Sequence, residues 1–381
     1  MRAVSEAFTK NFSGGLEVGA GLSIFRNGVE VVSLCGGYCD SARSKPWSQD
    51  TLVLIWSATK GVAAACTLHA MQQNGATLEN RVAEFWPEFA QAGKEAITLG
   101  HVLSHRAGLC VLDDVLANLL DRISVVRAIE NQKPVLPVDA GPAYGPKVFG
   151  FVLDEIVRRL TGGESLADYW RRVFANPLGI DLWIGLPESE HPRVASILPP
   201  RPGRPAPGDE LFARAFGDAD SLTRRAFGSP SGLVGISSMN APEVRSASLP
   251  SMGGIGSAHA LAKFYAMLAS GGALAGQVFF EKQTLGWMST PLTQGFDPVL
   301  QREMSFSAGF MLDPVDANGH KIRSLFGPSP SAFGHAGAGG SLGFADVERG
   351  FGFAYVMNQM ESGVLPHERC VSLVRSMEST G

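Results

Sequence analysis

The first residues that could do chemistry are a serine and a lysine three positions apart. Ser57-Ala58-Thr59-Lys60 follows the strand-like run 51–56 and opens an apolar segment that continues to Gln73. Residues i and i+3 of a helix share one face, so the Ser57 hydroxyl and the Lys60 amine can meet there. An apolar setting disfavours the charged form of a lysine, which lets the amine act as a base toward the serine.

The start of this helix also suits an oxyanion. A helix N-terminus offers unpaired backbone N–H groups and the positive end of the helix dipole, and both stabilise the oxygen that becomes negative when a serine attacks a carbonyl. A purely structural interpretation is equally open at this point. Ser57 could cap the helix, and Lys60 could extend its ammonium group into solvent.

Two later segments favour the catalytic interpretation. Tyr144-Gly145-Pro146 lies in a loop just ahead of an expected helix, where a tyrosine either reaches into a cleft or packs against the loop. The run from Phe333 to Ser341 contains His335 and four glycines. So many glycines indicate that a neighbouring strand or a ligand approaches the backbone closely.

With these three elements in this order, the chain resembles the serine β-lactamase and penicillin-binding-protein superfamily. It is similar to class C β-lactamases and most of all to the family VIII carboxylesterases. The matching motifs are S-x-x-K at 57–60, the tyrosine element at 144 and an H-x-G box at 335–337. The segments 103–109 and 339–360 extend the resemblance over nearly the whole chain. It implies a β-lactamase-like α/β (α+β) fold, with an antiparallel sheet flanked by helices and an inserted, mostly helical domain.

The resemblance also implies roles for individual residues. Ser57 is the acylated nucleophile, and Lys60 and Tyr144 share the proton transfers. The backbone N–H groups of Ser57 and Ala338 form the oxyanion hole. The H-x-G box contributes to the wall of the same site through Gly337.

The chain departs from the class C pattern at two positions. Pro146 stands where the Y-x-N element has asparagine, and His335, which lines the same wall as Gly337, replaces the lysine of K-T-G. Both changes remove groups that β-lactamases use around an amide or a carboxylate. We therefore expect hydrolysis of short-chain carboxylic esters through a covalent acyl-serine intermediate.

Two alternatives stay open on the same scaffold. One is an acyltransferase, or an amidase or β-lactamase-like hydrolase, which differs in the acceptor or in the bond cleaved. The other is a penicillin-binding or peptide-sensing module that is acylated without turnover.

Other chemically suggestive residues have simpler explanations. Gly339 to Gly343 matches G-x-S-x-G, but that elbow needs a helix after the serine, and here a strand-like run follows Ser341. We therefore do not expect Ser341 to be the nucleophile. His101 and His105 are expected to pack or to hydrogen-bond locally.

The motifs must be positioned by elements from both ends of the chain. An Asn27-Gly28 turn predicts a hairpin, and Pro/Gly/Arg-rich composition predicts a long loop over 187–232. We expect one discontinuous α/β domain, 1–70 plus 250–381, with 71–249 as the inserted helical and loop domain. The predicted strands are 18–25, 29–34, 305–312, 341–347 and 351–357, and the predicted helices are 57–73, 149–160, 166–175, 258–268 and 367–377.

Composition limits the possible partners. The chain has 381 residues, 45% hydrophobic, and a net charge of −4, which argues against a nucleic-acid-binding surface. The start of the sequence lacks the apolar core of a signal peptide, and no uncharged apolar window is long enough to span a membrane. Cys35 and Cys39 have no second Cys or His pair beside them, so no metal is expected. We expect a cytoplasmic protein acting on a small-molecule ester, without a cofactor, nucleic acid or membrane, and the oligomeric state stays open.

Overall fold

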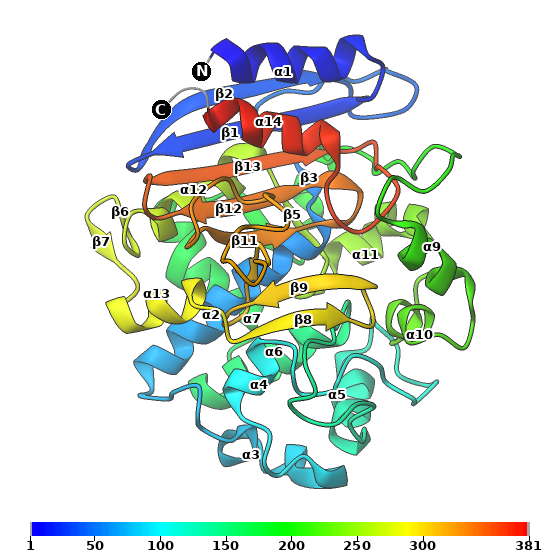
Figure 1. The fold of residues 1–381 in the computed structure, drawn as a ribbon, viewed down its shortest axis with the longest axis vertical. Helices are drawn as coiled ribbons and strands as arrows, with labels where there is room; N and C mark the ends of the chain where they lie inside the picture. Colours follow the sequence, from blue (N-terminus) through cyan, green and yellow to red (C-terminus); the bar gives the residue numbers. More distant parts are fainter. Residues whose placement is uncertain (1, 379–381) are drawn as a thin grey trace.

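The computed structural model describes residues 2–378. Its main sheet contains β1 (Gly19–Arg26), β2 (Val29–Gly37), β8 (Thr293–Asp297), β9 (Arg302–Phe306), β10 (Met311–Leu312), β11 (Phe333–Ala336), β12 (Leu342–Asp346) and β13 (Phe351–Met357). Within the described range these eight strands run antiparallel in the order β2-β1-β13-β12-β11-β10-β9-β8 (Figure 1). The first two strands of the chain therefore lie beside the last one.

A smaller sheet leads the chain to the S-x-x-K motif. It consists of β3 (Val53–Leu54), β4 (Leu182–Ile184) and β5 (Gly254–Gly256), with β5 in the middle. Only two residues of the predicted strand-like run 51–56 pair as a strand. A separate hairpin is formed by β6 (Ala273–Leu274) and β7 (Gln277–Val278).

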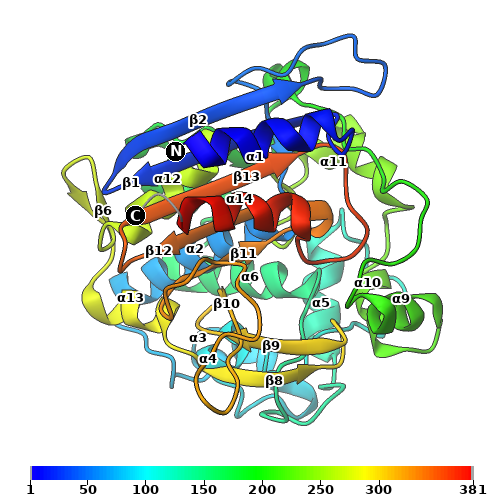
Figure 2. The same cartoon turned by 45° about the horizontal axis from the view of Figure 1, so that its top comes forward.

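Helices cover both faces of the main sheet (Figure 2). On one face, α12 (Ala258–Ala269) lies so close to β13 that a Cβ atom on Gly352 would be 2.4 Å from the backbone nitrogen of Ala266. On the other face lie α1 (Arg2–Ser13) and α14 (Glu368–Glu378). There, Tyr355 of β13 donates a hydrogen bond to Glu17, which also pairs with Arg369 of α14. Both termini thus help to close the core.

The central helix is α2 (Thr59–Gln73), and it is buried over most of its length, as its apolar sequence predicts. It packs beside α6 (Val148–Thr161) and α7 (Leu166–Trp170), which continues as a π-helical turn, Arg171–Ala175. The other α-helices are α3 (Val82–Phe85), α4 (Leu99–Leu103), α5 (Arg122–Asn131), α8 (Asn176–Leu178), α9 (Glu210–Gly217), α10 (Leu222–Gly228), α11 (Pro242–Ser246) and α13 (Lys282–Ser289). Short 3-10 turns are η1 (Trp56–Ala58), η2 (Pro87–Gly93), η4 (Glu188–Arg193), η5 (Ile236–Asn240) and η6 (Ala338–Gly340).

Two predictions from the sequence were wrong. The stretch 305–312 is not one strand, because the chain reverses at Gly309 (φ 84°) and its two halves pair with each other as β9 and β10. The region 187–232 is not all loop, because it contains α9 and α10. The aromatic rings of Phe212, Phe216 and Phe227 pack together between these helices, which gives the segment a small core of its own.

The predicted α/β architecture, an antiparallel sheet flanked by helices, is confirmed, and the hairpin at Asn27-Gly28 joins β1 and β2 as predicted. The division into a discontinuous domain and an inserted one stays a proposal. None of the helices within residues 2–378 has the length and apolar character needed to cross a membrane.

The contact between α12 and β13 yields a stability prediction. Gly352→Ala should lower the free energy of unfolding by about 1–3 kcal/mol, because the new methyl group meets helix backbone that cannot rotate away. Gly286→Ala is the matched control: its Cβ meets no atom within 4 Å and lies within α13, so alanine should stabilise by up to about 1 kcal/mol. Urea unfolding of both variants measures the two effects, and equal stabilities would contradict the close packing of helix on strand.

Candidate active site

Ser57 lies on a tight turn between a strand and the central helix. The chain leaves β3, passes through η1 and enters α2 two residues after the serine. Trp56, just before it, has φ 50°, a left-handed conformation that costs a tryptophan on the order of 1–3 kcal/mol. Ser57 is partly exposed, whereas the other residues from Thr51 to Lys60 are buried. The turn therefore presents this one side chain to solvent.

Hydrogen bonds from β5 hold the turn in place. The Thr59 hydroxyl donates to the carbonyl of Trp56 (2.5 Å) and accepts from the N–H of Gly254 (2.8 Å). The N–H of Ile55 donates to the carbonyl of Gly254 (2.9 Å). These bonds offset the cost of the left-handed residue at the turn.

The glycine-rich segment braces the same turn from the other side. The Ser341 hydroxyl, fully buried, donates to the carbonyl of Ile55 (2.9 Å), and the chain continues from it into β12. A Cβ atom on Gly337 would lie 2.3 Å from that same carbonyl oxygen, so only glycine fits there. Ser341 is thus part of the support of the turn, which agrees with the expectation that it is not a nucleophile.

Lys60 lies beneath Ser57 with its amine fully engaged. Its Nζ is 3.2 Å from Ser57 Oγ, 2.7 Å from the carbonyl oxygen of Pro146 and 2.9 Å from that of Ser251. The side chain is buried, and none of the ion pairs found within residues 2–378 includes it. Burial without a carboxylate partner lowers the pKa of Lys60 well below its ordinary value.

This arrangement fixes the orientation of the N–H bonds and the lone pair of the neutral Lys60 amine. A neutral amine has two N–H bonds and one lone pair. The two carbonyl oxygens can only accept, so they take the two N–H groups of Lys60. The lone pair is then left for the hydroxyl of Ser57, which is the geometry required of a general base.

Tyr144 completes the group of polar side chains around the serine. It precedes α6 and is buried, and the Ser57 side chain acts on its hydroxyl by lowering the pKa of Tyr144 against the larger effect of burial. The Lys60 Nζ lies 4.8 Å from the centre of its ring. Burial raises the pKa of Tyr144, so the side chain is a phenol and can give up a proton only where a stronger base forms beside it.

Pro146 contributes to the site through its backbone. The sequence shows only that its side chain cannot replace the amide of an asparagine. In the structure, its carbonyl oxygen is one of the two acceptors that hold Lys60.

His335 stands near Tyr144 as a neutral ring. The two ring centres are 6.1 Å apart. Its Nδ1 donates to the carbonyl of Ala336 (2.7 Å), which assigns the proton to that nitrogen, and Nε2 has no partner within the described chain. Burial and the nearby Lys60 lower the pKa of His335 to about 3. The position that carries lysine in the class C pattern therefore carries no positive charge at neutral pH.

The N–H group expected to form the second half of the oxyanion hole belongs to Ala338. This residue is partly exposed between buried neighbours and opens η6. The carbonyl of Gly339 accepts from Arg369 (3.1 Å) and from the N–H of Glu361 (2.9 Å), which anchors this turn to the C-terminal part of the chain. The pairing of Ala338 with Ser57 as an oxyanion hole stays a prediction.

The two histidines of the neighbouring segment behave as expected. His105 is buried, and its Nδ1 accepts from the N–H of Gly145 (3.2 Å). His101 caps the start of its own helix by accepting from the N–H of Thr98 (3.2 Å). Neither is bonded to Ser57, so a histidine-based triad is not formed.

Two contributors to the site escaped the sequence analysis. Ser251 acts through a backbone carbonyl, for which no residue type gives a signal. Asp297, a fully buried carboxylate on β8, accepts a hydrogen bond from the N–H of Tyr144 (2.8 Å). An Asp followed directly by Pro298 is typical of an exposed turn, and only tertiary structure shows it to be buried.

The comparison with known families agrees with this geometry. A family model described as "Beta-lactamase" matches residues 8–369. The chain belongs to the beta-lactamase family.

Several proteins are similar to this chain over most of their length. "Esterase/beta-lactamase LipL" of Mycobacterium tuberculosis (strain ATCC 25618 / H37Rv) is 30% identical over 364 residues, covering 94% of this chain and 81% of LipL. A crystal structure of a family VIII carboxylesterase is 35% identical, with a TM-score of 0.87, and covers 99% of this chain and 96% of its own. A penicillin-binding protein homolog from Caulobacter crescentus is 34% identical, also with a TM-score of 0.87, covering 100% and 97%.

The environment of His335 yields a spectroscopic prediction. With a pKa of about 3, the ring should stay neutral and carry its proton on Nδ1 as the pH falls from about 8 to about 5, where an ordinary histidine becomes charged. Nitrogen NMR of isotope-labelled histidines measures both protonation and tautomer, and His335→Gln assigns the signal. A His335 ring that is half protonated near pH 6.5 would show that the burial described here is wrong.

Proposed function

We propose that this protein is a serine carboxylesterase that cleaves short-chain carboxylic esters through an acyl intermediate on Ser57. One observation carries the proposal. The carbonyls of Pro146 and Ser251 hold the buried amine of Lys60, so that the lone pair of the neutral amine is left for Ser57 Oγ. A serine hydroxyl needs an adjacent base to attack at neutral pH, and this is the base nearest to it.

In the proposed acylation, the Ser57 oxygen attacks the ester carbonyl carbon while its proton passes to the neutral amine of Lys60. The electron pair of the carbonyl double bond moves to the carbonyl oxygen, which the N–H groups of Ser57 and Ala338 receive. The bond to the alcohol oxygen then breaks. That oxygen takes the phenol proton of Tyr144, and the ammonium of Lys60 returns a proton to the phenolate.

Deacylation repeats these steps with water as the nucleophile. A water molecule attacks the acyl carbon and loses one proton to the Lys60–Tyr144 pair. The bond between the acyl carbon and Ser57 Oγ breaks, and the serine oxygen takes the proton back. A carboxylic acid leaves, and the side chains return to their starting protonation states.

The electrostatics of the site favour a neutral substrate. His335 is neutral and presents a lone pair at Nε2, and Lys60 loses its charge through burial. A carboxylate, such as that of a β-lactam, would find no constant cationic partner at either side chain. An ester needs neither, because the oxyanion hole and an alkoxide leaving group suffice.

The relatives support this reaction class. The 35% identical structure is a carboxylesterase, and LipL carries both "esterase" and "beta-lactamase" in its name. That second word makes β-lactam hydrolysis the candidate to test beside the ester reaction.

The first prediction of this proposal concerns the nucleophile. A fluorophosphonate should form an adduct at Ser57, and Ser57→Ala should lose several orders of magnitude in turnover. Ser341→Ala is the matched control: it removes only the bond to the carbonyl of Ile55, so labelling at Ser57 should persist. Mass spectrometry of the labelled peptides locates the adduct, and an adduct on Ser341 would falsify the assignment.

The second prediction concerns the substrate. Among p-nitrophenyl esters, acetyl and butyryl should give a higher kcat/KM than octanoyl. Nitrocefin should be slower than the best ester by about 10- to 100-fold, which corresponds to one missing charge-assisted hydrogen bond. Steady-state kinetics at mildly alkaline pH measure both. Nitrocefin turnover equal to that of the best ester, or an optimum at long chains, would contradict the proposed specificity.

A further inference from the structure

Asp297 is a carboxylate buried without a cation. It ends β8 and has no measurable exposure. The ion pairs found within residues 2–378 do not include it. Its two oxygens instead accept hydrogen bonds from three backbone N–H groups. One oxygen accepts from Tyr144 (2.8 Å), and the other accepts from Val299 (2.8 Å) and Leu300 (2.9 Å).

Such a group is costly and needs an explanation. Burying an ionised carboxylate costs several kcal/mol even when hydrogen bonds satisfy it. Two of its three bonds close the local turn after β8, which an Asp could do at the surface without that cost. The third bond joins it to Tyr144, 153 residues away in the sequence, and this contact requires the carboxylate to be inside.

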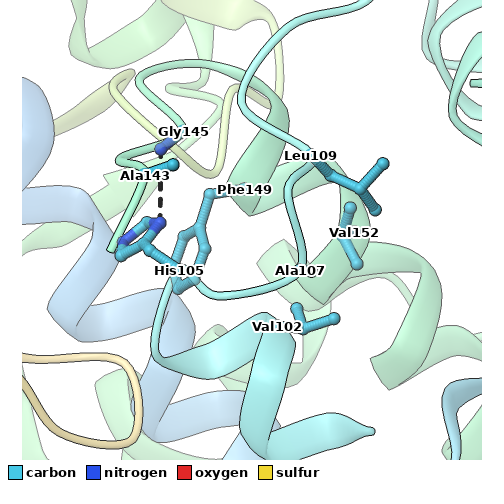
Figure 3. Close-up of a pocket in the computed structure, with 8 residues that line it drawn as sticks. All are labelled: Val102, His105, Ala107, Leu109, Ala143, Gly145, Phe149 and Val152. Atoms are coloured by element: carbon cyan, nitrogen blue, oxygen red, sulfur yellow. Dashed lines mark hydrogen bonds between the residues drawn. The ribbon is translucent and has the colours of Figure 1, made fainter. Parts of the chain in front are cut away.

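The loop that carries Tyr144 is held by hydrogen bonds as well as by packing, in which the Tyr144 ring stacks on that of Phe306 with 6.1 Å between ring centres. A cavity of about 20 Å³ adjoins it, lined among others by His105, Ala143, Gly145 and Phe149 (Figure 3). His105 anchors one side of the loop, since its ring accepts from the N–H of Gly145 and its carbonyl from the N–H of Ala143 (2.9 Å). Between these two contacts, the N–H of Tyr144 itself points to Asp297. His105 therefore holds the residues on either side of Tyr144, and Asp297 holds the N–H of the tyrosine itself.

We propose that Asp297 is the positioning residue for Tyr144: its carboxylate fixes the tyrosine backbone so that the ring stays beside Lys60 and the hydroxyl stays at Ser57. The inference rests on the proposed function, in which Tyr144 transfers a proton to the leaving alcohol. Burial raises the pKa of Asp297 to about 7, and in its charged form the carboxylate adds to burial in raising the pKa of Tyr144.

The test is a double-mutant cycle. Asp297→Asn removes the charge and replaces one of the two acceptor oxygens by an NH2 group, which only donates. The side chain can then no longer accept hydrogen bonds from all three N–H groups. Because a small displacement of a proton donor costs up to about 100-fold, kcat for p-nitrophenyl butyrate should fall by about 10- to 100-fold with little change in KM. In a Tyr144→Phe background, Asp297→Asn should lower kcat no further, because its effect on kcat acts through the tyrosine hydroxyl that this background lacks.

Asp313 provides the matched control. It is also a buried carboxylate after a strand of the main sheet, and it accepts from the N–H groups of Leu325 (2.9 Å) and Phe326 (3.1 Å), but unlike Asp297 it also pairs with Lys321 (3.1 Å). Its partners lie outside the Tyr144 loop. Asp313→Asn should therefore leave kcat per folded molecule unchanged, with the folded fraction measured by near-UV circular dichroism, and any effect should multiply with that of Tyr144→Phe.

The outcomes separate the two proposals. If Tyr144→Phe lowers kcat but Asp297→Asn does not, or if their losses multiply, the positioning role is overturned and the esterase mechanism stands. If Tyr144→Phe leaves kcat unchanged, the proton role of the tyrosine fails, and the positioning role fails with it. Should Asp297→Asn not fold, Asp297→Glu keeps the charge but moves it by one methylene, and the same non-additive loss of kcat is expected.

Discussion

The geometry around Ser57 depends on keeping the amine of Lys60 buried away from water. Burying an ammonium group costs several kcal/mol unless it is paired, and Lys60 has two carbonyl oxygens and a hydroxyl in place of a carboxylate. Such a setting makes the neutral amine the favoured form. The acceptors come from distant parts of the chain, residues 146 and 251, so the fold must bring both to the start of α2 before the lysine can act as a base.

The two sheets divide this work. The small sheet holds the turn at Ser57 through β5, and the main sheet presses Gly337 and Ser341 against the carbonyl of Ile55. Behind the main sheet, Arg369 joins the carbonyl of Gly339 to the buried Glu17. Burial raises the pKa of Glu17 to about 8 although the neighbouring Arg369 acts to lower it, so this carboxyl is mostly neutral at pH 7. Glu17 and Arg369, from the first and last parts of the chain, thus stabilise the turn at Gly339.

The sequence predicted those parts of the site in which a side-chain type does the chemistry. Ser57, Lys60, Tyr144 and His335 occur in recognisable motifs, and the structure places these four side chains together. It could not predict the carbonyl of Ser251, because every residue has a carbonyl. The burial of Asp297 also escaped, since that depends on which loop packs over β8.

The fold, like the site, was predicted where residue types and their spacing give a signal and was missed where they do not. Strands with regular apolar patterns and the buried central helix were predicted closely. The break between β9 and β10 was missed because apolar residues continue through the turn at Gly309, and periodicity alone does not show a reversal. Helices α9 and α10 were missed because their small aromatic core is masked by the Pro- and Gly-rich composition around it.

A consequence for substrate choice comes from the charges taken together. Burial lowers the pKa of Lys60 and of His335 and raises that of Tyr144, so each of these three groups favours its neutral form. The carboxyl group nearest to the tyrosine, that of Asp297, is turned toward backbone N–H groups. Under the proposed function, discrimination between an ester and an anionic substrate does not need a steric clash. It would follow because the groups around Ser57 offer no fixed positive charge to offset the desolvation of a carboxylate.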